Sequence, residues 1–199
     1  GLVFELNPQT GDRRINGTAA SLAGMGRPAE RFAVDRLLCG YAMVFGFGGV
    51  PLIFSGDEVA LLNDPSYLRE PEHTNDSRWV HRPRMPWGDL EASPHAHEVF
   101  ERLRNMIHVR KSTESLHASV QTTVMPTSVA SVTCFVRKHP AGQMLQVYNV
   151  ADYAVQVPAW EFEQKVAGAH VDLLTGSMLT VTDGMVELPP YAALWLVPT

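Results

Sequence analysis

The segment NDSRWVHRPRMPWGD, residues 75–89, gathers the side chains of this chain that are best suited to bind a polar small molecule. It contains three arginines, Arg78, Arg82 and Arg84, together with two tryptophans and a histidine. A planar guanidinium can hold a carboxylate through two hydrogen bonds and keep further donors for hydroxyl groups. Indole rings add apolar faces. The segment lacks helical or strand periodicity, which indicates an irregular binding loop.

Histidines are the second group of residues that could do chemistry. His73, His95 and His97 show no usable metal spacing with a third ligand. We therefore expect neither a bound metal nor an organic cofactor.

The composition limits the classes of partner. The chain has 199 residues, a formal charge of −5 and 45% hydrophobic residues, which suffices for a core and for one or two domains. The chain has no surplus of basic residues, so nucleic acid is not an expected partner. No apolar run approaches the roughly 20 residues that span a bilayer.

The two cysteines and the first residues bear on the compartment. Cys39 falls in a helical pattern and Cys134 in a strand pattern, so we expect both to be buried and reduced. The chain begins without a methionine or a signal-peptide pattern and reads as a chain entered in the middle. A cytoplasmic location is expected, with secretion left open.

The first half shows α/β periodicity. Apolar residues at helical spacing predict a helix from near Pro28 to about residue 45, stopped by Gly46, Gly48 and Gly49. Residues 50–54 form a continuous apolar run typical of a parallel strand buried on both faces. A loop of about thirty residues follows, which is far longer than usual. Ser93-Pro94 then predicts the start of a helix that runs to about Lys111.

The second half changes to short β-rich runs. Strands are predicted at 120–124, 132–136, 145–148, 155–158, 171–174 and 194–197, and Asp183-Gly184 predicts a hairpin between LTVT and MVEL. We place the boundary between the two parts at residues 112 and 113. The α/β part, residues 1–112, cannot cover both faces of a parallel strand, so its neighbours must lie upstream or in another chain.

Several stretches resemble the last part of glycoside hydrolases of the α-amylase clan. GGVPLIFSGDE is similar to the eighth barrel strand of that clan, VFERLRNMIHVRKST to the eighth barrel helix, and LPPYAALWLVP to the end of its C-terminal β-sandwich. FELNPQTGDRRINGTAASLAG and NDSRWVHRPR are similar to amylosucrase and the related sucrose hydrolases.

The resemblance implies an α/β plus all-β fold, in which the C-terminal part of a (β/α)8 barrel is followed by a small antiparallel β-sandwich. Residues 1–112 would supply the end of the loop after strand seven, helix seven, strand eight, a long loop and helix eight, and residues 113–199 the sandwich. In such barrels the active site lies on loops at the carboxyl ends of the strands.

The implied activity is a retaining cleavage of sucrose through a covalent glucosyl-enzyme. The expected protein is the C-terminal segment of an amylosucrase-like glucosyltransferase that passes glucose to an α-1,4-glucan. A sucrose hydrolase of the same fold is the first alternative, and a non-catalytic carbohydrate-binding or structural module is the second. The nucleophile and the acid/base are expected upstream, so no catalytic residue is assigned here and the isolated chain is expected to be inactive. Its expected partners are sucrose, the glucan acceptor and the upstream barrel segment.

Five residues are candidates for substrate binding. By resemblance, Arg78 pairs with an upstream aspartate and closes the glucosyl pocket, with Asp76 orienting it. Arg14 by resemblance lines the acceptor side, although a solvated arginine beside Asp12 is an equal alternative. Arg82 and His81 either line the acceptor channel or brace the loop.

The remaining polar and aromatic residues of these segments are expected to be structural. We expect Trp79 and Trp87 to anchor the loop rather than stack on sugars. The resemblance implies that Asp57 and Glu58 are structural and tie the loop through backbone N–H groups. Two adjacent carboxylates on one turn also cannot flank a glycosidic bond at the roughly 5 Å of a retaining pair. Arg13 is expected to be exposed.

Overall fold

The computed structural model describes residues 1–89 and 95–199, and it divides into two compact units. The first unit comprises residues 1–37 and 53–101, and the second comprises residues 38–52 and 102–199. The helices α2 (Ala33–Phe47) and α3 (Ala96–Ser112) therefore contribute residues to both units. The assignment of residues 1–112 to a barrel stays a prediction.

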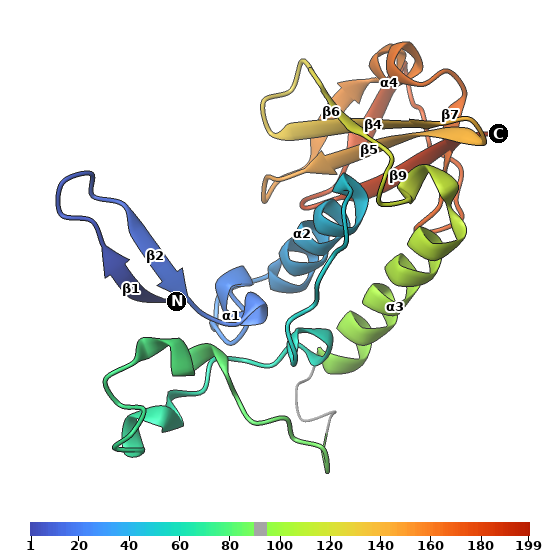
Figure 1. Cartoon of the computed structure of the whole chain (residues 1–199). Helices are drawn as coiled ribbons and strands as arrows, with labels where there is room; N and C mark the ends of the chain where they lie inside the picture. The colour runs from blue at the N-terminus through green and yellow to red at the C-terminus, as the bar shows by residue number, and fades with distance from the viewer. Residues whose placement is uncertain (90–94) are drawn as a thin grey trace. The chain divides into compact units, whose positions relative to one another are not determined.

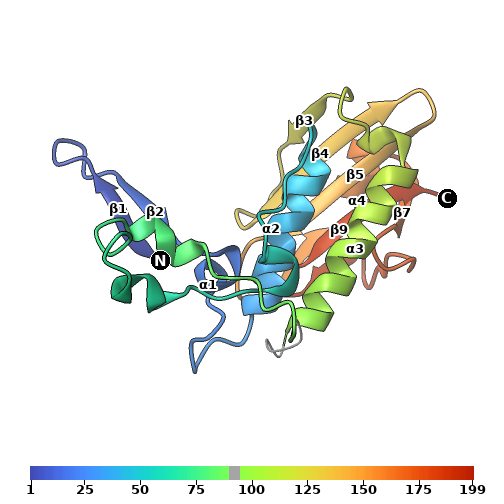
Figure 2. The ribbon, with the colours of Figure 1, turned by 60° about the horizontal axis from the view of Figure 1, so that its bottom comes forward.

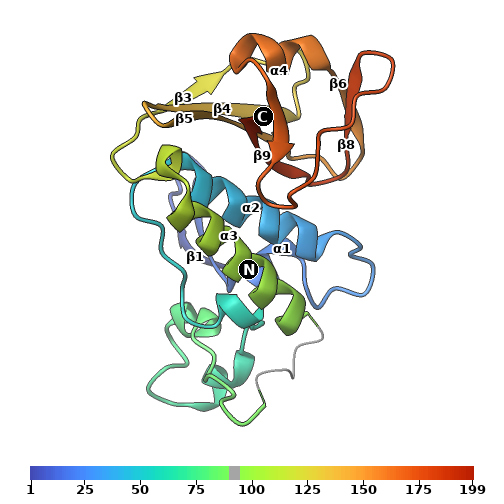
Figure 3. The same ribbon diagram turned by 90° about the vertical axis from the view of Figure 1, so that its right-hand side faces the viewer.

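The second unit contains two antiparallel sheets (Figure 1). The larger sheet has the strand order β3-β4-β5-β9-β7 and the smaller one pairs β6 with β8. Their bounds are β3 Thr122–Met125, β4 Val132–His139, β5 Gly142–Asn149, β6 Val155–Pro158, β7 Ala169–Asp172, β8 Met185–Leu188 and β9 Ala193–Pro198. The short helices of this unit are η4 (Glu114–Leu116) and α4 (Ala159–Lys165). Figure 3 shows α4 on one side of the larger sheet and the parts of α2 and α3 that belong to this unit on the other.

The core of the second unit lies between the two sheets. Cys134 of β4 and Val147 of β5, which lie opposite each other in the antiparallel register, are fully buried. They pack with Val157 of β6 and Leu188 of β8 in one cluster. This confirms the small antiparallel β-sandwich.

Both cysteines are free and buried, as expected. Burial raises the pKa of the Cys134 thiol to about 11, because the thiolate would lose its hydration inside the core.

Most of the strands agree with the sequence prediction, and two regions differ. The 171–174 strand is shifted to Ala169–Asp172. LTVT forms no strand. Instead β8 pairs with β6 in the register Val155↔Leu188, and Thr182 and Met185 share only an isolated bridge around the turn at Asp183 and Gly184. The β6 strand offers a full ladder, whereas the hairpin alone would pair few residues.

Residues 1–27 contain regular secondary structure. They form an antiparallel hairpin of β1 (Leu2–Leu6) and β2 (Arg13–Asn16), followed by α1 (Ala19–Ala23). The Asn7 side chain accepts from the amide of Gln9 at 2.9 Å in the turn, and Gly11 adopts a φ of 75°. Thr18 caps α1.

The expected strand at residues 50–54 is not formed. These residues have no strand pairing, and Val50 and Leu52 are 81% and 83% exposed. A parallel strand exists only through hydrogen bonds to its neighbours, and the described part of the chain holds no barrel strand to provide them. The helix expected from Pro28 begins at Ala33 and continues through Gly46 to Phe47. The expected cap at Ser93-Pro94 lies outside the described residues.

The long segment after residue 54 consists of short 3-10 turns, η1 (Asp57–Val59), η2 (Pro65–Arg69) and η3 (Ser77–His81). Asp64 and Asp76 cap the last two through their side chains. Among the described residues, no helix combines the length and the apolar composition that crossing a bilayer requires.

Candidate functional site

The first unit brings the two arginine motifs together. The β1–β2 hairpin lies beside η3 (Figure 2), and the side-chain amide of Asn16 donates to the hydroxyl of Ser77 at 3.1 Å. The Arg78 guanidinium stands over the Phe4 ring at 5.1 Å from its centroid. The hairpin therefore supports the loop that carries Arg78.

Arg78 and Asp76 form a two-pronged ion pair. Arg78 Nε donates to Asp76 Oδ1 at 2.8 Å and Nη2 donates to Oδ2 at 2.8 Å. The same carboxylate accepts from the Arg78 amide at 3.0 Å, so it caps η3 as well. The side-chain and backbone hydrogen bonds from Arg78 lower the pKa of Asp76 to about 2. Asp76 thus orients Arg78, as the sequence predicted.

Arg14 lies on the hairpin beside a different acid from the one expected. Its Nη1 lies 3.2 Å from Glu5 Oε2, and both side chains are exposed. Asp12, the expected partner, accepts from the Thr10 hydroxyl at 2.5 Å instead. The charge of Glu5 also contributes to raising the pKa of Arg78, so this carboxylate is close enough to influence both arginines.

A hollow of about 610 Å³ adjoins these hairpin residues. Its lining residues come from both strands and the turn: Glu5, Leu6, Asn7, Asp12, Arg13 and Arg14. Arg14 is thus available to a ligand on this face of the hairpin, and Arg13 is exposed as expected.

Trp79 is packed within the loop. Its ring stacks on His73 at 3.6 Å between centroids, and the Arg82 guanidinium lies 5.0 Å from the Trp79 centroid. His73 is held in turn by Glu70, at 2.6 Å. Trp79 and Arg82 therefore brace the loop. Trp87 is 79% exposed, so the expectation that it anchors the loop is wrong within the described residues.

His81 carries a buried polar atom without a partner. Its Nδ1 has no hydrogen bond in the part of the chain that the structure describes, and its ring meets Phe54 edge-on at 5.7 Å. Burial, and then the charge of Arg82, lower the pKa of His81. A neutral imidazole with an unpaired nitrogen needs a partner from outside these residues, because buried polar groups are almost always hydrogen-bonded.

One comparison with known protein families concerns the second unit. Residues 123–197 match the sequence model of a family described as the amylosucrase C-terminal domain. This part of the β-domain is thus similar in sequence to the C-terminal domain of amylosucrase.

Solved structures of α-amylase-family enzymes share the fold. AmyP in complex with maltotriose superimposes with a TM-score of 0.68 at 13% identity, over 89% of this chain and 38% of that one. Amy13B of Eubacterium rectale gives a TM-score of 0.60 at 16% identity, over 92% and 37%. The trehalulose synthase MutB in complex with Tris gives 0.59 at 19% identity, over 92% and 41%. The chain thus spans about two-fifths of these enzymes at most.

The chain thus shares its fold with these enzymes, and its β-domain is similar in sequence to an amylosucrase C-terminal domain. The paired acids before the long loop are structural, as expected. Glu58 Oε2 accepts from the amide of Gly56 at 2.7 Å, and the buried Asp57 accepts from the amide of Ala19 at 3.4 Å.

No group of three metal-binding side chains occurs in residues 1–89 and 95–199.

Sequence reasoning missed Glu5 and the hairpin that carries it. A signal was present, because two short runs, LVFEL and RRIN, flank a turn-forming NPQTGD segment. The contact between this hairpin and η3 joins residues 61 positions apart, which no local pattern reveals.

Proposed function

We propose that this chain is the C-terminal segment of an amylosucrase-like retaining enzyme, which cleaves sucrose and transfers the glucosyl group to an α-1,4-glucan. The observation that carries the proposal is the amylosucrase C-terminal domain at residues 123–197. The Arg78–Asp76 pair beside the hairpin supports it, because it occupies the motif by which the sequence resembles sucrose-active enzymes.

In this function Arg78 contacts the transferred glucosyl unit. Asp76 engages Nε and Nη2, which fixes the plane of the guanidinium and leaves Nη1 donors for a sugar hydroxyl or an upstream carboxylate. A preoriented cation of this kind stabilises a transition state better than a flexible one, because it needs no reorganisation as charge develops.

Arg14, Arg82 and His81 belong to the acceptor side. Arg14 borders the hairpin hollow, Arg82 holds Trp79 in place, and the unpaired Nδ1 of His81 can exchange a hydrogen bond with a sugar hydroxyl. An upstream aspartate attacks the glucosyl carbon and an upstream glutamic acid protonates the departing fructose. Glucan or water then resolves the covalent intermediate.

The test compares Arg78→Ala and Arg14→Ala in the protein encoded by the complete gene. Arg78→Ala should lower the kcat/KM for fructose release by two orders of magnitude or more, because its contact tightens at the reacting carbon. Arg14→Ala should change fructose release much less, and should raise the ratio of free glucose to transferred glucosyl. Loss of one or two acceptor hydrogen bonds weakens glucan capture by about 1–3 kcal/mol, while water needs no such contact.

Arg27→Ala is the control, since Arg27 is exposed and does not line the hairpin hollow. Equal kinetic losses for Arg78→Ala and Arg14→Ala in folded protein would refute the assignment of Arg78. Free glucose as the main product of the unmodified enzyme, even with added glucan, would favour sucrose hydrolase. Absence of fructose release together with glucan binding would favour the non-catalytic module.

A further inference from the structure

A hollow of about 300 Å³ lies in the β-domain between α4 and the connection from β3 to β4. Its lining comprises Met125, Pro126, Thr127 and Ser128 from the connection, and Trp160, Glu161, Gln164 and Lys165 from α4. None of these residues belongs to the site around Arg78.

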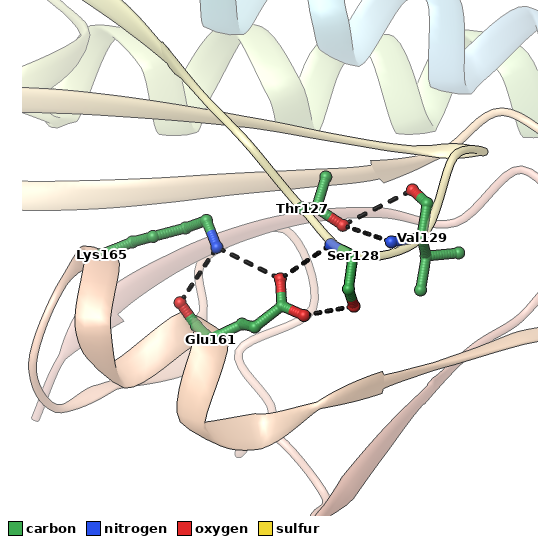
Figure 4. Close-up of polar contacts among 5 residues, drawn as sticks. All are labelled: Thr127, Ser128, Val129, Glu161 and Lys165. Atoms are coloured by element: carbon green, nitrogen blue, oxygen red, sulfur yellow. Dashed lines mark hydrogen bonds and ion pairs between the residues drawn. The ribbon is translucent and has the colours of Figure 1, made fainter.

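The hollow is lined by a nearly buried ion pair (Figure 4). The side chains of Lys165 and Glu161 are 6% and 5% exposed, and Lys165 Nζ lies 3.4 Å from Glu161 Oε2. Lys165 also donates to the Glu161 carbonyl at 3.1 Å. The Ser128 hydroxyl donates to Glu161 Oε1 and its amide donates to Oε2 at 3.2 Å.

This ion pair is charged but balanced. Burial alone would raise the pKa of Glu161, but the hydrogen bonds from Ser128 and the charge of Lys165 outweigh it and lower that pKa. Glu161 therefore stays ionised near neutral pH, and its carboxylate faces the Lys165 side chain. A buried ion pair is a weak source of stability, so its presence beside a surface hollow suggests a second role.

An exposed indole borders the same hollow. Trp160 is 57% exposed, and Gln164 follows it by one helical turn on the same face of α4. A large apolar ring beside a few placed polar groups is the usual make-up of a small-molecule site. The apolar face of a pyranose ring can lie on the indole while its hydroxyls meet the amide of Gln164 and the ion pair. A balanced charge suits a neutral, hydroxyl-rich ligand better than an anion or a cation.

We propose that Trp160, Gln164 and the Glu161–Lys165 pair form a saccharide-binding site on the β-domain, separate from the catalytic cleft, which holds an α-1,4-glucan chain. The choice of an α-glucan rests on the proposed function, in which such a chain is the acceptor. The site would keep glucan near the enzyme while its end is extended.

Titration of the 199-residue chain with maltoheptaose tests the site, followed through the indole N–H resonances. The Trp160 resonance should shift with maltoheptaose, whereas that of the fully buried Trp195 should not. Trp160→Ala should weaken binding at least tenfold, and Gln164→Ala several-fold. Tyr153→Ala is the matched control, because Tyr153 is another exposed aromatic residue of the same domain, 60% exposed and outside the hollow. This control should bind as the unmodified chain does.

The failures of the site and of the proposed function give different results. The site is overturned if no binding is detected at maltoheptaose concentrations on the order of 10 mM, or if Trp160→Ala binds maltoheptaose as tightly as the unmodified chain does. Either result overturns it even if the complete enzyme releases fructose from sucrose. Equal affinity for cellohexaose overturns the choice of an α-1,4-glucan. Absence of fructose release by the complete protein refutes the proposed function, whereas a Trp160-dependent affinity for maltoheptaose would still support the site.

Discussion

At the scale of single residues, the arginines of this chain serve two purposes that their partners distinguish. Arg78 and Arg14 are at least half exposed and pair with carboxylates, which keeps donors available for a ligand. Arg137 is fully buried and its hydrogen bonds go to backbone carbonyls and one hydroxyl. The contact between Arg78 and Asp76 could be predicted from the sequence because the two residues are only two positions apart.

The pKa of Asp76 provides a direct test of the Arg78 pair. Its pKa is lowered from 3.8 to about 2, so the pair contributes fully above pH 4 and is lost as the pH falls through 2. The side-chain carboxyl carbon of Asp76 should therefore titrate near pH 2 by NMR. In Arg78→Ala its pKa should rise, because the side-chain hydrogen bonds from Arg78 are lost, but it should stay below the ordinary value of about 3.9, since the backbone hydrogen bond from residue 78 remains. A titration near 4 in the unmodified chain would show that the ion pair does not persist in solution.

At the scale of elements, the C-terminus of α2 is held by side chains of the β-domain. The last carbonyls of a helix have no partner within it and carry partial negative charge. Here Arg137 and Gln146 donate to the Gly46 carbonyl at 3.1 and 2.9 Å, and the Tyr148 hydroxyl donates to Ala42 at 3.1 Å. Arg110 reaches the carbonyl of Gly49 at 2.6 Å. The β-domain thus fixes the end of α2 and the residues that follow it.

Gly46 has a packing role rather than the stop role that the sequence suggested. A Cβ at this position would lie 2.5 Å from the Tyr148 hydroxyl and 2.6 Å from Gln146 Oε1. The glycine lets the helix approach the sheet closely enough for those side chains to reach its carbonyls.

Replacing Arg137 by methionine should be strongly destabilising. The carbonyls of Ser115 and His117 lose the donors that Arg137 supplies, and the Gly46 carbonyl loses one of its donors. Each buried unsatisfied group costs about 1–3 kcal/mol, so the free energy of unfolding should fall by about 3 kcal/mol or more. Arg137→Lys should not restore the free energy of unfolding, because an ammonium cannot donate hydrogen bonds in three directions within one plane as a guanidinium does. Urea denaturation of the chain measures this.

Lys138→Met is the matched control, at the exposed neighbouring position of the same strand. Its effect should stay within about 0.5 kcal/mol. Similar losses for both variants would mean that the hydrogen bonds of Arg137 contribute little.

The sequence could predict those elements whose pattern is local. The strands β4, β5, β6 and β9 were found because each is a short run rich in β-forming residues, and turn signals separate these runs. Arg137 and Gln146 were missed as interior residues, because a polar side chain in a strand is ordinarily assigned to the solvent side. Their burial depends on α2, about a hundred residues away. The same limit hid the contact between the hairpin and η3.

At the scale of the whole molecule, the exposed apolar residues Val50 and Leu52 bear on the proposed function. Val50 and Leu52 are apolar and exposed in this chain, and a barrel strand there would bury them between neighbours. The chain spans about two-fifths at most of the compared enzymes, whose longer chains leave room for such neighbours. We expect the upstream segment of the proposed enzyme to supply both the adjoining strands and the carboxylates.

The 199-residue chain alone should therefore not cleave sucrose. A retaining cleavage needs a nucleophile and an acid about 5 Å apart on either side of the bond. Asp57 and Glu58 are engaged by backbone amides, and Asp76 is ionised and held by Arg78, so it cannot act as a proton donor near neutral pH. Fructose release from sucrose by the purified chain should equal the buffer blank, with the protein of the complete gene as the positive control. Turnover at an ordinary enzymatic rate, abolished by Asp57→Asn or Asp76→Asn, would show that the catalytic acids lie within this chain.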